Sequence, residues 1–244
     1  MKKVVITGAS SGIGRSAALK FCASGYSVVA LGRSEIKLAR LKEEALGCSG
    51  KLSTEACDLL DFKAVSSILE KHHDLEILIN NAGIYQRTDW LNPVLGEYEA
   101  LFDTNVKAAY LISQCAIKTW KAQDSHGLIL HNASTLGNKP APFAGLYSAS
   151  KAALLSLSKS IAMEFAPNIR SIAILPGVID TPIHQTMGEE KALEFRKTMA
   201  GFHPLGRIGS PEDISSLMLW LCSEESQWIT GSEFVVDGGI SLVC

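Results

Sequence analysis

The sequence lacks any long uninterrupted apolar run. A membrane-spanning helix needs about 20 consecutive apolar residues, and no segment of this chain approaches that length. The N-terminus also lacks the pattern of a secretory signal, because the short apolar run Val4–Ile6 passes at once into Thr7-Gly8 without a small-residue cleavage site. We therefore expect a cytoplasmic protein with no membrane partner.

The chain also has little net charge and no metal-binding or redox pattern. Its formal net charge is −2 and its charged residues are interspersed, which excludes an extended basic surface for nucleic acid or anionic lipid. Six cysteines lie at scattered spacings with no C-x-x-C pair, so we expect them to be reduced and mostly buried. No H-x-x-x-H pattern places two histidines on one helical face, and no metal site is predicted.

What the chain does contain is a regular alternation of strands and helices over 244 residues, 47% of them hydrophobic. Strands are expected at residues 3–7, 27–31, 52–57, 75–79, 128–131, 169–175 and 234–236. Helices are expected at about 12–24, 35–46, 93–120 and 146–165, with two more that begin at Asp61 and Ser210. Apolar strands joined by helices predict a doubly wound α/β fold with a seven-stranded parallel sheet and helices on both faces.

One long segment, residues 181–209, falls outside this alternation. Long connections in compact domains are uncommon unless they serve a function, so we interpret it as a substrate loop or lid with a short helix inside. The alternative is that the segment has no functional role.

A glycine-rich turn between the first expected strand and helix is the first motif with a chemical interpretation. Gly8, Gly12 and Gly14 let the backbone turn sharply and approach phosphate oxygens, and the helix start offers unpaired N–H groups. The spacing G-x-x-x-G-x-G differs from the commonest dinucleotide fingerprint, but its position at the first strand favours a dinucleotide pyrophosphate. The residues expected to form this site are Gly8, Ser10, Ser11, Gly12, Ile13, Gly14 and Arg15.

Arg33 follows the second expected strand, where an acidic residue would pair with the ribose hydroxyls of NAD. Its planar, permanently charged guanidinium suits a ribose 2′-phosphate instead, as does that of Arg15. We therefore predict NADP(H) in preference to NAD(H). The alternative is that Arg33 is a solvated charge at a helix start and that the protein accepts either cofactor.

Residues after the third and fourth expected strands complete the predicted cofactor site. Asp58 is expected to accept a hydrogen bond from the adenine amino group, although its spacing fits a helix cap almost as well. The segment Asn80-Asn81-Ala82-Gly83 ends a strand with polar and tiny residues, which suits close packing of the backbone against the cofactor. The cofactor residues predicted in these segments are Asp58, Leu59, Asn81, Ala82 and Gly83.

Tyr147 and Lys151 lie one helical turn apart and share a helix face. A phenol has a pKa of about 10, too high for easy proton exchange near neutrality, and a neighbouring ammonium lowers it. Ser134, just past the fifth expected strand, offers a hydroxyl for a substrate oxygen, and Lys151 can also reach nicotinamide ribose hydroxyls. This set predicts proton transfer at an oxygen while a hydride moves at the adjacent carbon.

Together these motifs make the chain resemble the short-chain dehydrogenase/reductase family over essentially its whole length. The matching segments are T-G-A-S-S-G-I-G at 7–14, N-N-A-G at 80–83, Asn105, Ser134, Y-S-A-S-K at 147–151, P-G-V-I-D-T at 176–181 and V-D-G-G at 236–239. The resemblance implies that residues 1–244 form a single NAD(P)-binding Rossmann-type domain. It also implies the catalytic residues Asn105, Ser134, Tyr147 and Lys151.

In the role that the resemblance implies, Asn105 holds a water that relays protons to Lys151. The nicotinamide carboxamide is expected between Pro176-Gly177 and Thr181, with Val178 as a backbone contact. The family is usually tetrameric, so a homotetramer or homodimer is expected, paired through the helices that carry Asn105 and Tyr147. The alternative is a monomer in which the last of these helices is fully buried.

The chain departs from the family pattern just before Ser134, where His131-Asn132-Ala133 replaces the usual Asn, aliphatic residue and Ser. Asn132 lies in an expected buried strand, so it needs hydrogen-bond partners there and is expected to shape the pocket.

The expected substrate pocket is mostly apolar and without an arginine clamp. It favours reduction of a neutral ketone, aldehyde, steroid-like or acyl carbonyl over that of a phosphorylated sugar. The pocket residues expected are Tyr85, Trp90, Leu136, Phe143, Ile183, His184, Met187 and Phe202.

Two alternatives to a general carbonyl reductase stay open. A 3-oxoacyl-(acyl-carrier-protein) reductase would need a basic docking patch, for which Lys118, Lys121 and Lys139 are the candidates. A non-catalytic NADP(H)-sensing protein belongs to another class, and the intact proton-transfer residues argue against it, because a sensor needs no proton relay.

Overall fold

A seven-stranded parallel sheet forms the centre of the molecule, in the order β3-β2-β1-β4-β5-β6-β7. This computed structural model describes every residue except 93, 184–187 and 244. The strands are β1 (Lys3–Thr7), β2 (Ser27–Gly32), β3 (Lys51–Ala56), β4 (Ile77–Asn80), β5 (Gly127–Asn132), β6 (Ile169–Pro176) and β7 (Glu233–Val236). The predicted seven-stranded parallel sheet is confirmed.

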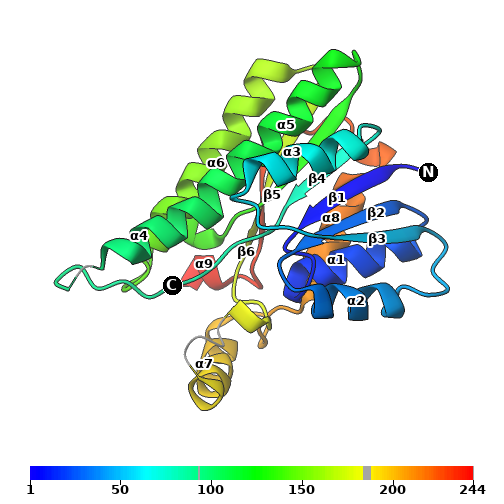
Figure 1. Ribbon diagram of the computed structural model, residues 1–244. Helices are drawn as coiled ribbons and strands as arrows, with labels where there is room; N and C mark the ends of the chain where they lie inside the picture. The colour runs from blue at the N-terminus through cyan, green and yellow to red at the C-terminus, as the bar shows by residue number, and fades with distance from the viewer. Residues whose placement is uncertain (93, 184–187, 244) are drawn as a thin grey trace.

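Helices cover both faces of the sheet, as Figure 1 shows. Because side chains alternate along a strand, Val4 and Ile6 of β1 pack toward α1, α2 and α8, whereas Val5 packs toward α3 and α5. The doubly wound α/β arrangement is therefore confirmed. The helices are α1 (Gly12–Ala23), α2 (Glu35–Glu44), α3 (Phe62–Lys71), α4 (Leu95–Phe102), α5 (Ala108–Ala122), α6 (Gly145–Phe165), α7 (Glu189–Phe202), α8 (Pro211–Leu221) and α9 (Ile240–Val243).

Two predicted helix starts have the expected caps. The Asp61 carboxylate accepts a hydrogen bond from the Ala64 N–H at 3.1 Å and begins α3. Ser210 and Asp213 form a capping box at α8, with Pro211 in the first turn. These local signals fix where each helix begins.

The helix expected over residues 93–120 differs from the prediction. It consists of α4 and α5 joined by a π-helical turn, Asp103–Lys107, and residue 93 lies outside the described part of the chain. The wider turn carries Asn105, whose side chain binds the backbone of Ile84 after β4. This side chain–backbone contact explains the local departure from α-helical geometry.

The segment 181–209 contains α7, a helix of 14 residues and therefore longer than the short helix expected. Ala192, Phe195 and Met199 recur at helical spacing, and they supply the apolar stripe that lets α7 form and face inward. Figure 1 shows α7 set apart from the sheet, beyond the end of β6.

The strand order reverses between β1 and β4, and a hydrogen-bonded junction joins the carboxyl ends of these two strands. The Thr7 hydroxyl accepts hydrogen bonds from the N–H groups of Asn81 at 2.9 Å and Ala82 at 3.0 Å. The Asn81 amide in turn donates to the Thr7 carbonyl at 2.9 Å. In open α/β sheets such a reversal is where a ligand crevice forms, so the fold directs attention to this edge.

Neither a membrane-spanning helix nor a metal-binding cluster occurs among the described residues. None of the helices is long and apolar enough to cross a membrane. Within the same residues, His, Cys, Asp and Glu side chains form no group of three or more that could hold a metal ion.

Candidate active site

Two adjoining cavities lie along the carboxyl ends of the strands, with volumes of about 500 and 510 Å³. The first, here the glycine-loop cavity, is lined by the turn after β1, the start of α2 and the end of β3. The second, here the tyrosine cavity, is lined by Ser134, Tyr147, Lys151, the segment after β6, and α7. The two adjoin one another, because they share the lining residues Ile13, Asn81, Gly83, Tyr85, Asn132, Thr181 and Ile183.

The glycines after β1 are required by geometry. Gly8 has φ +64° and Gly12 has φ +53°, a left-handed conformation that other residues rarely adopt. A Cβ at Gly8 would lie 2.8 Å from the Ala82 Cα. A Cβ at Gly14 would lie 2.4 Å from both the Asn81 Nδ2 and the Gly8 oxygen, so Gly14 lets α1 pack against the loop. Gly8 and Gly12 line the glycine-loop cavity, whereas Gly14 supports it from behind.

The start of α1 has the chemistry of an anion site. Ser11 is the N-cap residue, but its side chain makes no capping hydrogen bond, so it leaves the N–H groups of the first turn uncapped. Ser10, Ser11, Gly12 and Ile13 all line the cavity. Free N–H groups at the positive end of a helix dipole, next to a backbone that approaches closely, fit a pyrophosphate.

The two predicted 2′-phosphate arginines lie in different places. Arg33 is exposed, lines the glycine-loop cavity and forms no ion pair with any described residue. Arg15 lines neither cavity and instead pairs with Glu44 on α2. Lys37, four residues after Arg33, also lines the glycine-loop cavity. Sequence reasoning missed Lys37, although a spacing of four at a helix start indicates a shared face.

Asp58 and Leu59, two of the predicted cofactor residues, line the same cavity. The Asp58 carboxylate accepts a hydrogen bond from the Leu60 N–H at 3.0 Å, which closes a turn before α3. The alternative that Asp58 caps α3 is wrong, because Asp61 occupies that position.

The tyrosine cavity brings together three of the four predicted catalytic side chains. Ser134 follows β5, and Tyr147 and Lys151 project from one face of α6. Tyr147 is 8% and Lys151 4% exposed. The Lys151 Nζ lies 5.7 Å from the centre of the Tyr147 ring and donates a hydrogen bond to the Asn132 carbonyl at 2.9 Å.

Asn105, the fourth predicted residue, is fully buried behind the cavity wall. Its amide nitrogen donates to the Ile84 carbonyl and to the Ser150 hydroxyl, both at 3.0 Å, while its oxygen accepts from the Ile84 N–H at 2.8 Å. A Cβ at Gly83 would lie 3.2 Å from the Asn105 Oδ1 and 3.3 Å from the Lys151 Nζ. The Asn105 amide oxygen and the Lys151 ammonium therefore both lie next to Gly83, in the space that a side chain at this position would occupy.

Burial controls the protonation of the central groups. It raises the pKa of Tyr147 to about 12, although the hydrogen-bonded Ser134 hydroxyl acts in the opposite direction. It also lowers the pKa of Lys151 to about 8, because the interior disfavours the charged ammonium. The expectation that Lys151 makes the phenol acidic is therefore wrong for this arrangement. Desolvation dominates the pKa of Tyr147, and the ammonium binds the Asn132 carbonyl instead of the phenol oxygen.

The segment after β6 forms another wall of the tyrosine cavity. Pro176, Gly177 and Val178 line it, and Thr181 lies where the two cavities meet. A Cβ at Gly177 would lie 2.8 Å from the Asp237 Cβ, so a glycine is needed for this segment to pack against the turn after β7.

Only some of the predicted pocket residues line the tyrosine cavity. Tyr85, Leu136 and Ile183 line the tyrosine cavity. Trp90, Phe143 and Phe202 do not, and His184 and Met187 lie outside the described residues. The wall also contains residues that sequence reasoning left out of the pocket, among them Arg87, Lys139, Phe195, Met199, Ile240 and Ser241.

The comparison with known proteins agrees with this geometry. A family model described as "Enoyl-(Acyl carrier protein) reductase" matches residues 8–241. The chain belongs to the short-chain dehydrogenase/reductase family. As a member, it is an NAD(P)-dependent oxidoreductase that acts on CH–OH groups.

Relatives of this dehydrogenase/reductase are named for different activities. It is 32% identical to a 3-oxoacyl-(acyl-carrier-protein) reductase FabG of Thermotoga maritima, over 99% of this chain and 98% of that protein. It is 34% identical to an L-rhamnose 1-dehydrogenase (NAD(P)(+)) of Azotobacter vinelandii, over 98% and 96%. A crystal structure of L-sorbose reductase from Gluconobacter frateurii, complexed with NADPH and L-sorbose, aligns with a TM-score of 0.89 at 28% identity, over 98% of this chain and 96% of that one.

The departure of this dehydrogenase/reductase before Ser134 has a structural consequence. The Asn132 amide donates a hydrogen bond to the Asn81 oxygen at 2.9 Å, and Asn132 lines both cavities, which confirms that it has a partner and shapes the pocket. His131 points to the other face of β5, where its Nδ1 lies 3.4 Å from the Asn80 amide nitrogen. Burial, with the charge of Lys151, lowers the pKa of His131 to about 3, so it is neutral.

Proposed function

We propose that this protein is an NADP(H)-dependent carbonyl reductase, which transfers a hydride between nicotinamide and a carbonyl carbon or secondary alcohol. One observation carries the proposal: of two adjoining cavities, one has cationic side chains just after β2 without an ion pair to any described residue, and the other has a buried Ser-Tyr-Lys set beyond the end of β5. A dinucleotide has an anionic and a reactive end, and these cavities offer each end a matching environment.

In reduction, Tyr147 donates the proton. A phenol with a pKa of about 12 keeps its proton through the neutral range, so it is ready to act as a general acid while negative charge develops on the substrate oxygen. Ser134, hydrogen-bonded to the phenol, holds that oxygen and stabilises its charge. Bound reduced nicotinamide supplies the hydride.

Lys151 and Asn105 support the phenol after it has given up its proton. The Lys151 Nζ lies 5.7 Å from the centre of the Tyr147 ring, and we infer that its positive charge limits the cost of forming the phenolate, although burial keeps the pKa of Tyr147 raised. Asn105 is held by three hydrogen bonds, so its amide is fixed beside Gly83 and Lys151. We infer that a water held there connects Lys151 to solvent and restores the proton.

The preference for NADP(H) rests on Arg33 and Lys37. Both line the glycine-loop cavity, and no acidic side chain at the end of β2 competes with a 2′-phosphate there. Relatives whose printed titles name NADP or NADPH support this preference. Because the cellular NADP(H) pool is largely in the reduced form, we propose carbonyl reduction as the direction of the reaction in the cell.

A carbonyl panel tests this function directly. The purified protein is mixed with NADPH and each of a set of ketones and aldehydes, and loss of the reduced-nicotinamide absorbance is followed. We expect turnover of at least one carbonyl, with a higher kcat/KM for NADPH than for NADH. Binding of NADPH without consumption across the whole panel would instead support a non-catalytic sensing protein.

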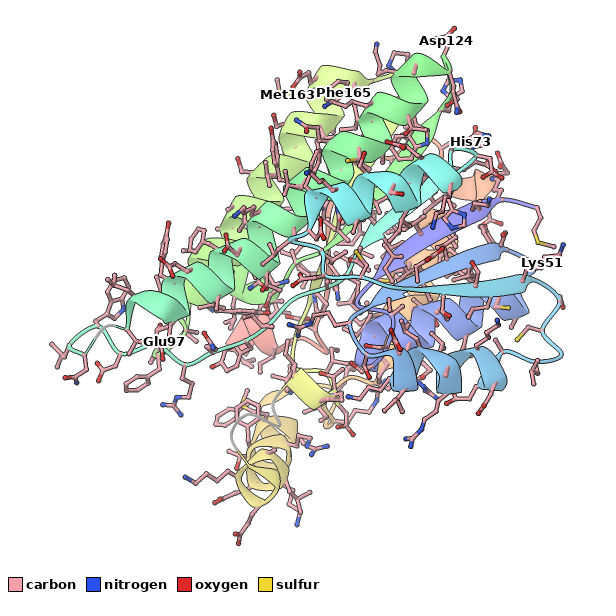
Figure 2. All side chains as sticks on the ribbon, viewed as in Figure 1. Lys51, His73, Glu97, Asp124, Met163 and Phe165 are labelled. Atoms are coloured by element: carbon pink, nitrogen blue, oxygen red, sulfur yellow. The ribbon has the colours of Figure 1, made fainter. Side chains whose placement is uncertain are left out.

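A 3-oxoacyl-(acyl-carrier-protein) reductase is the second candidate, favoured by relatives printed with that name. Its docking patch is less well supported. Lys139 lines the tyrosine cavity, but Lys118 and Lys121 lie near the C-terminal end of α5, close to Asp124, which Figure 2 shows at the far end of the molecule. A protein-linked acyl substrate included in the panel distinguishes the two candidates.

We also propose a cytoplasmic homotetramer or homodimer. The face of α6 that points away from the sheet carries exposed Ala149, Ala152 and Met163, the last 87% exposed, which excludes a fully buried α6 in the single chain. Figure 2 shows Met163 at the C-terminal end of α6, the opposite end from Tyr147. Light scattering of the purified protein measures the assembly size.

A further inference from the structure

The tyrosine cavity carries an unbalanced charge. Its described lining includes the basic side chains of Arg87, Lys139 and Lys151, and none of those lining residues is Asp or Glu. Lys151 belongs to the proton-transfer set, which leaves Arg87 and Lys139 without a role in the proposed chemistry. This finding departs from the expectation of a pocket that lacks an arginine.

Arg87 is held in position beside the reacting groups. Its guanidinium carbon lies 4.7 Å from the centre of the Phe143 ring, and the Thr88 N–H donates to the Phe143 carbonyl at 2.9 Å, which ties together the loops after β4 and β5. Tyr85 connects Arg87 to the catalytic phenol. The charge of Arg87 lowers the pKa of Tyr85 against the effect of burial, and the rings of Tyr85 and Tyr147 meet edge to face at 5.1 Å.

Lys139 approaches the same cavity from the loop after β5. Its Nζ donates a hydrogen bond to the Ser241 carbonyl at 3.2 Å, which links this loop to α9. The Lys139 side chain is exposed, so water solvates its ammonium when no anion is bound. Neither Lys139 nor Arg87 forms an ion pair within the described part of the chain.

The cofactor does not account for these two charges. The proposed phosphate positions lie in the glycine-loop cavity, with Arg33, Lys37 and the start of α1, and that cavity is not lined by Arg87 or Lys139. Arg87 and Lys139 are therefore available to a second anion at the tyrosine end of the cleft. Apolar side chains form much of the remaining wall of the tyrosine cavity, among them Leu136, Phe195, Met199 and Ile240.

We propose that the physiological substrate is an oxo acid, a carbonyl compound whose carboxylate binds Arg87 and Lys139 while its carbonyl lies at Ser134 and Tyr147. This inference rests on the proposed reductase function. The planar guanidinium matches a carboxylate through two parallel hydrogen bonds, and the ammonium adds a point charge. A short apolar chain between the carbonyl and the carboxylate fits the wall of a cavity of about 510 Å³.

Matched pairs of oxo acids and their methyl esters test the proposal, because esterification removes the charge and keeps the carbonyl. The kcat/KM of each member is measured with saturating NADPH for the native protein and for Arg87→Gln and Lys139→Gln. We expect the native protein to prefer the acid by about tenfold or more, and each variant to lose about tenfold on the acid with little change on the ester. The control is Lys121→Gln on α5, an exposed lysine outside both cavities, which should keep the native preference.

The outcomes separate this proposal from the function on which it rests. Equal turnover of acid and ester, unchanged in Arg87→Gln and Lys139→Gln, would overturn the oxo-acid assignment and leave the reductase function intact. A strong preference for phosphopantetheine thioesters over free acids would also overturn it, because the anion would then be a phosphate. If the native protein reduces neither member of any pair but reduces another carbonyl of the panel, the oxo-acid assignment alone fails; if it reduces no carbonyl at all, the reductase function fails and this assignment fails with it. NADPH binding and a cooperative thermal transition in each variant verify that it is folded.

Discussion

The two cavities are built in different ways. The glycine-loop cavity is made mainly of one local motif and the strand ends beside it, and its geometry depends on glycines that no other residue can replace without a clash. The tyrosine cavity is assembled from side chains of the loops after β4, β5 and β6 together with α7 and α9. The proposed function therefore assigns to the first a ligand that varies little, whereas the second can change with each substituted wall residue. Relatives at 31–34% identity are named for different substrates, which agrees with a substrate cavity that varies more than the cofactor cavity.

The largest effect is expected at the tyrosine end. Tyr147→Phe keeps the ring but removes the proton, so kcat should fall by about 10²- to 10⁴-fold while the dissociation constant of NADPH stays nearly unchanged. Rapid-mixing kinetics and a fluorescence titration measure the two quantities. Tyr110→Phe is the matched control, because Tyr110 is an exposed tyrosine on α5 outside both cavities. Near-native turnover by Tyr147→Phe would remove this residue from the mechanism.

At the other end, Arg33→Gln should alter cofactor choice and leave the chemistry intact. Loss of a charged contact to the 2′-phosphate is expected to lower kcat/KM for NADPH by about 10- to 100-fold, with little change for NADH. Arg40→Gln is the control, since Arg40 is exposed on α2 and lines neither cavity. If Arg33→Gln weakens both cofactors equally, the predicted 2′-phosphate site is wrong.

A pH profile separates the two buried groups of the tyrosine cavity. The pKa of Lys151 is lowered to about 8, so its ammonium is fully present well below pH 8 and is lost as pH rises through that value. The pKa of Tyr147 is raised to about 12, so the phenol keeps its proton over the same range. The kcat/KM for reduction should therefore be flat near neutrality and fall above about pH 8. A fall on the acidic side alone would contradict these assignments.

The smallest effect is expected from a residue that supports the sheet but lines neither cavity. Ser210→Ala removes the cap of α8, which packs against α1 behind the glycine loop, and should lower the free energy of unfolding by about 1 kcal/mol. Urea unfolding measures the loss, and the kinetic constants with either cofactor should not change. A change in NADPH affinity would contradict the view that the glycine-loop cavity is formed mainly by one local motif, because it would show that the cavity also depends on α8.

The sequence predicts best what short-range chemistry determines. Short apolar runs between helical stretches predicted all seven strands, and the caps Asp61 and Ser210 predicted where two helices begin. The location of Arg33 at the glycine-loop cavity could be predicted because the residue directly follows β2, and the carboxyl end of that strand lies at the cavity.

The parts that the sequence did not reveal depend on tertiary packing. Arg87 and Ile240 reach the tyrosine cavity from segments far apart in the chain, and only the packed fold brings them to one wall. The π-helical turn at Asn105 depends on a contact with Ile84. The pKa of Tyr147 is governed by its burial, which the spacing of Tyr147 and Lys151 does not report.

A crystal structure of the protein with NADP⁺ tests most directly whether the two cavities form one cofactor cleft. We predict that the 2′-phosphate contacts Arg33 and Lys37 and that the nicotinamide ring lies in the tyrosine cavity beside Tyr147. A phosphate that contacts neither cation, or a nicotinamide ring bound outside the tyrosine cavity, would contradict this account.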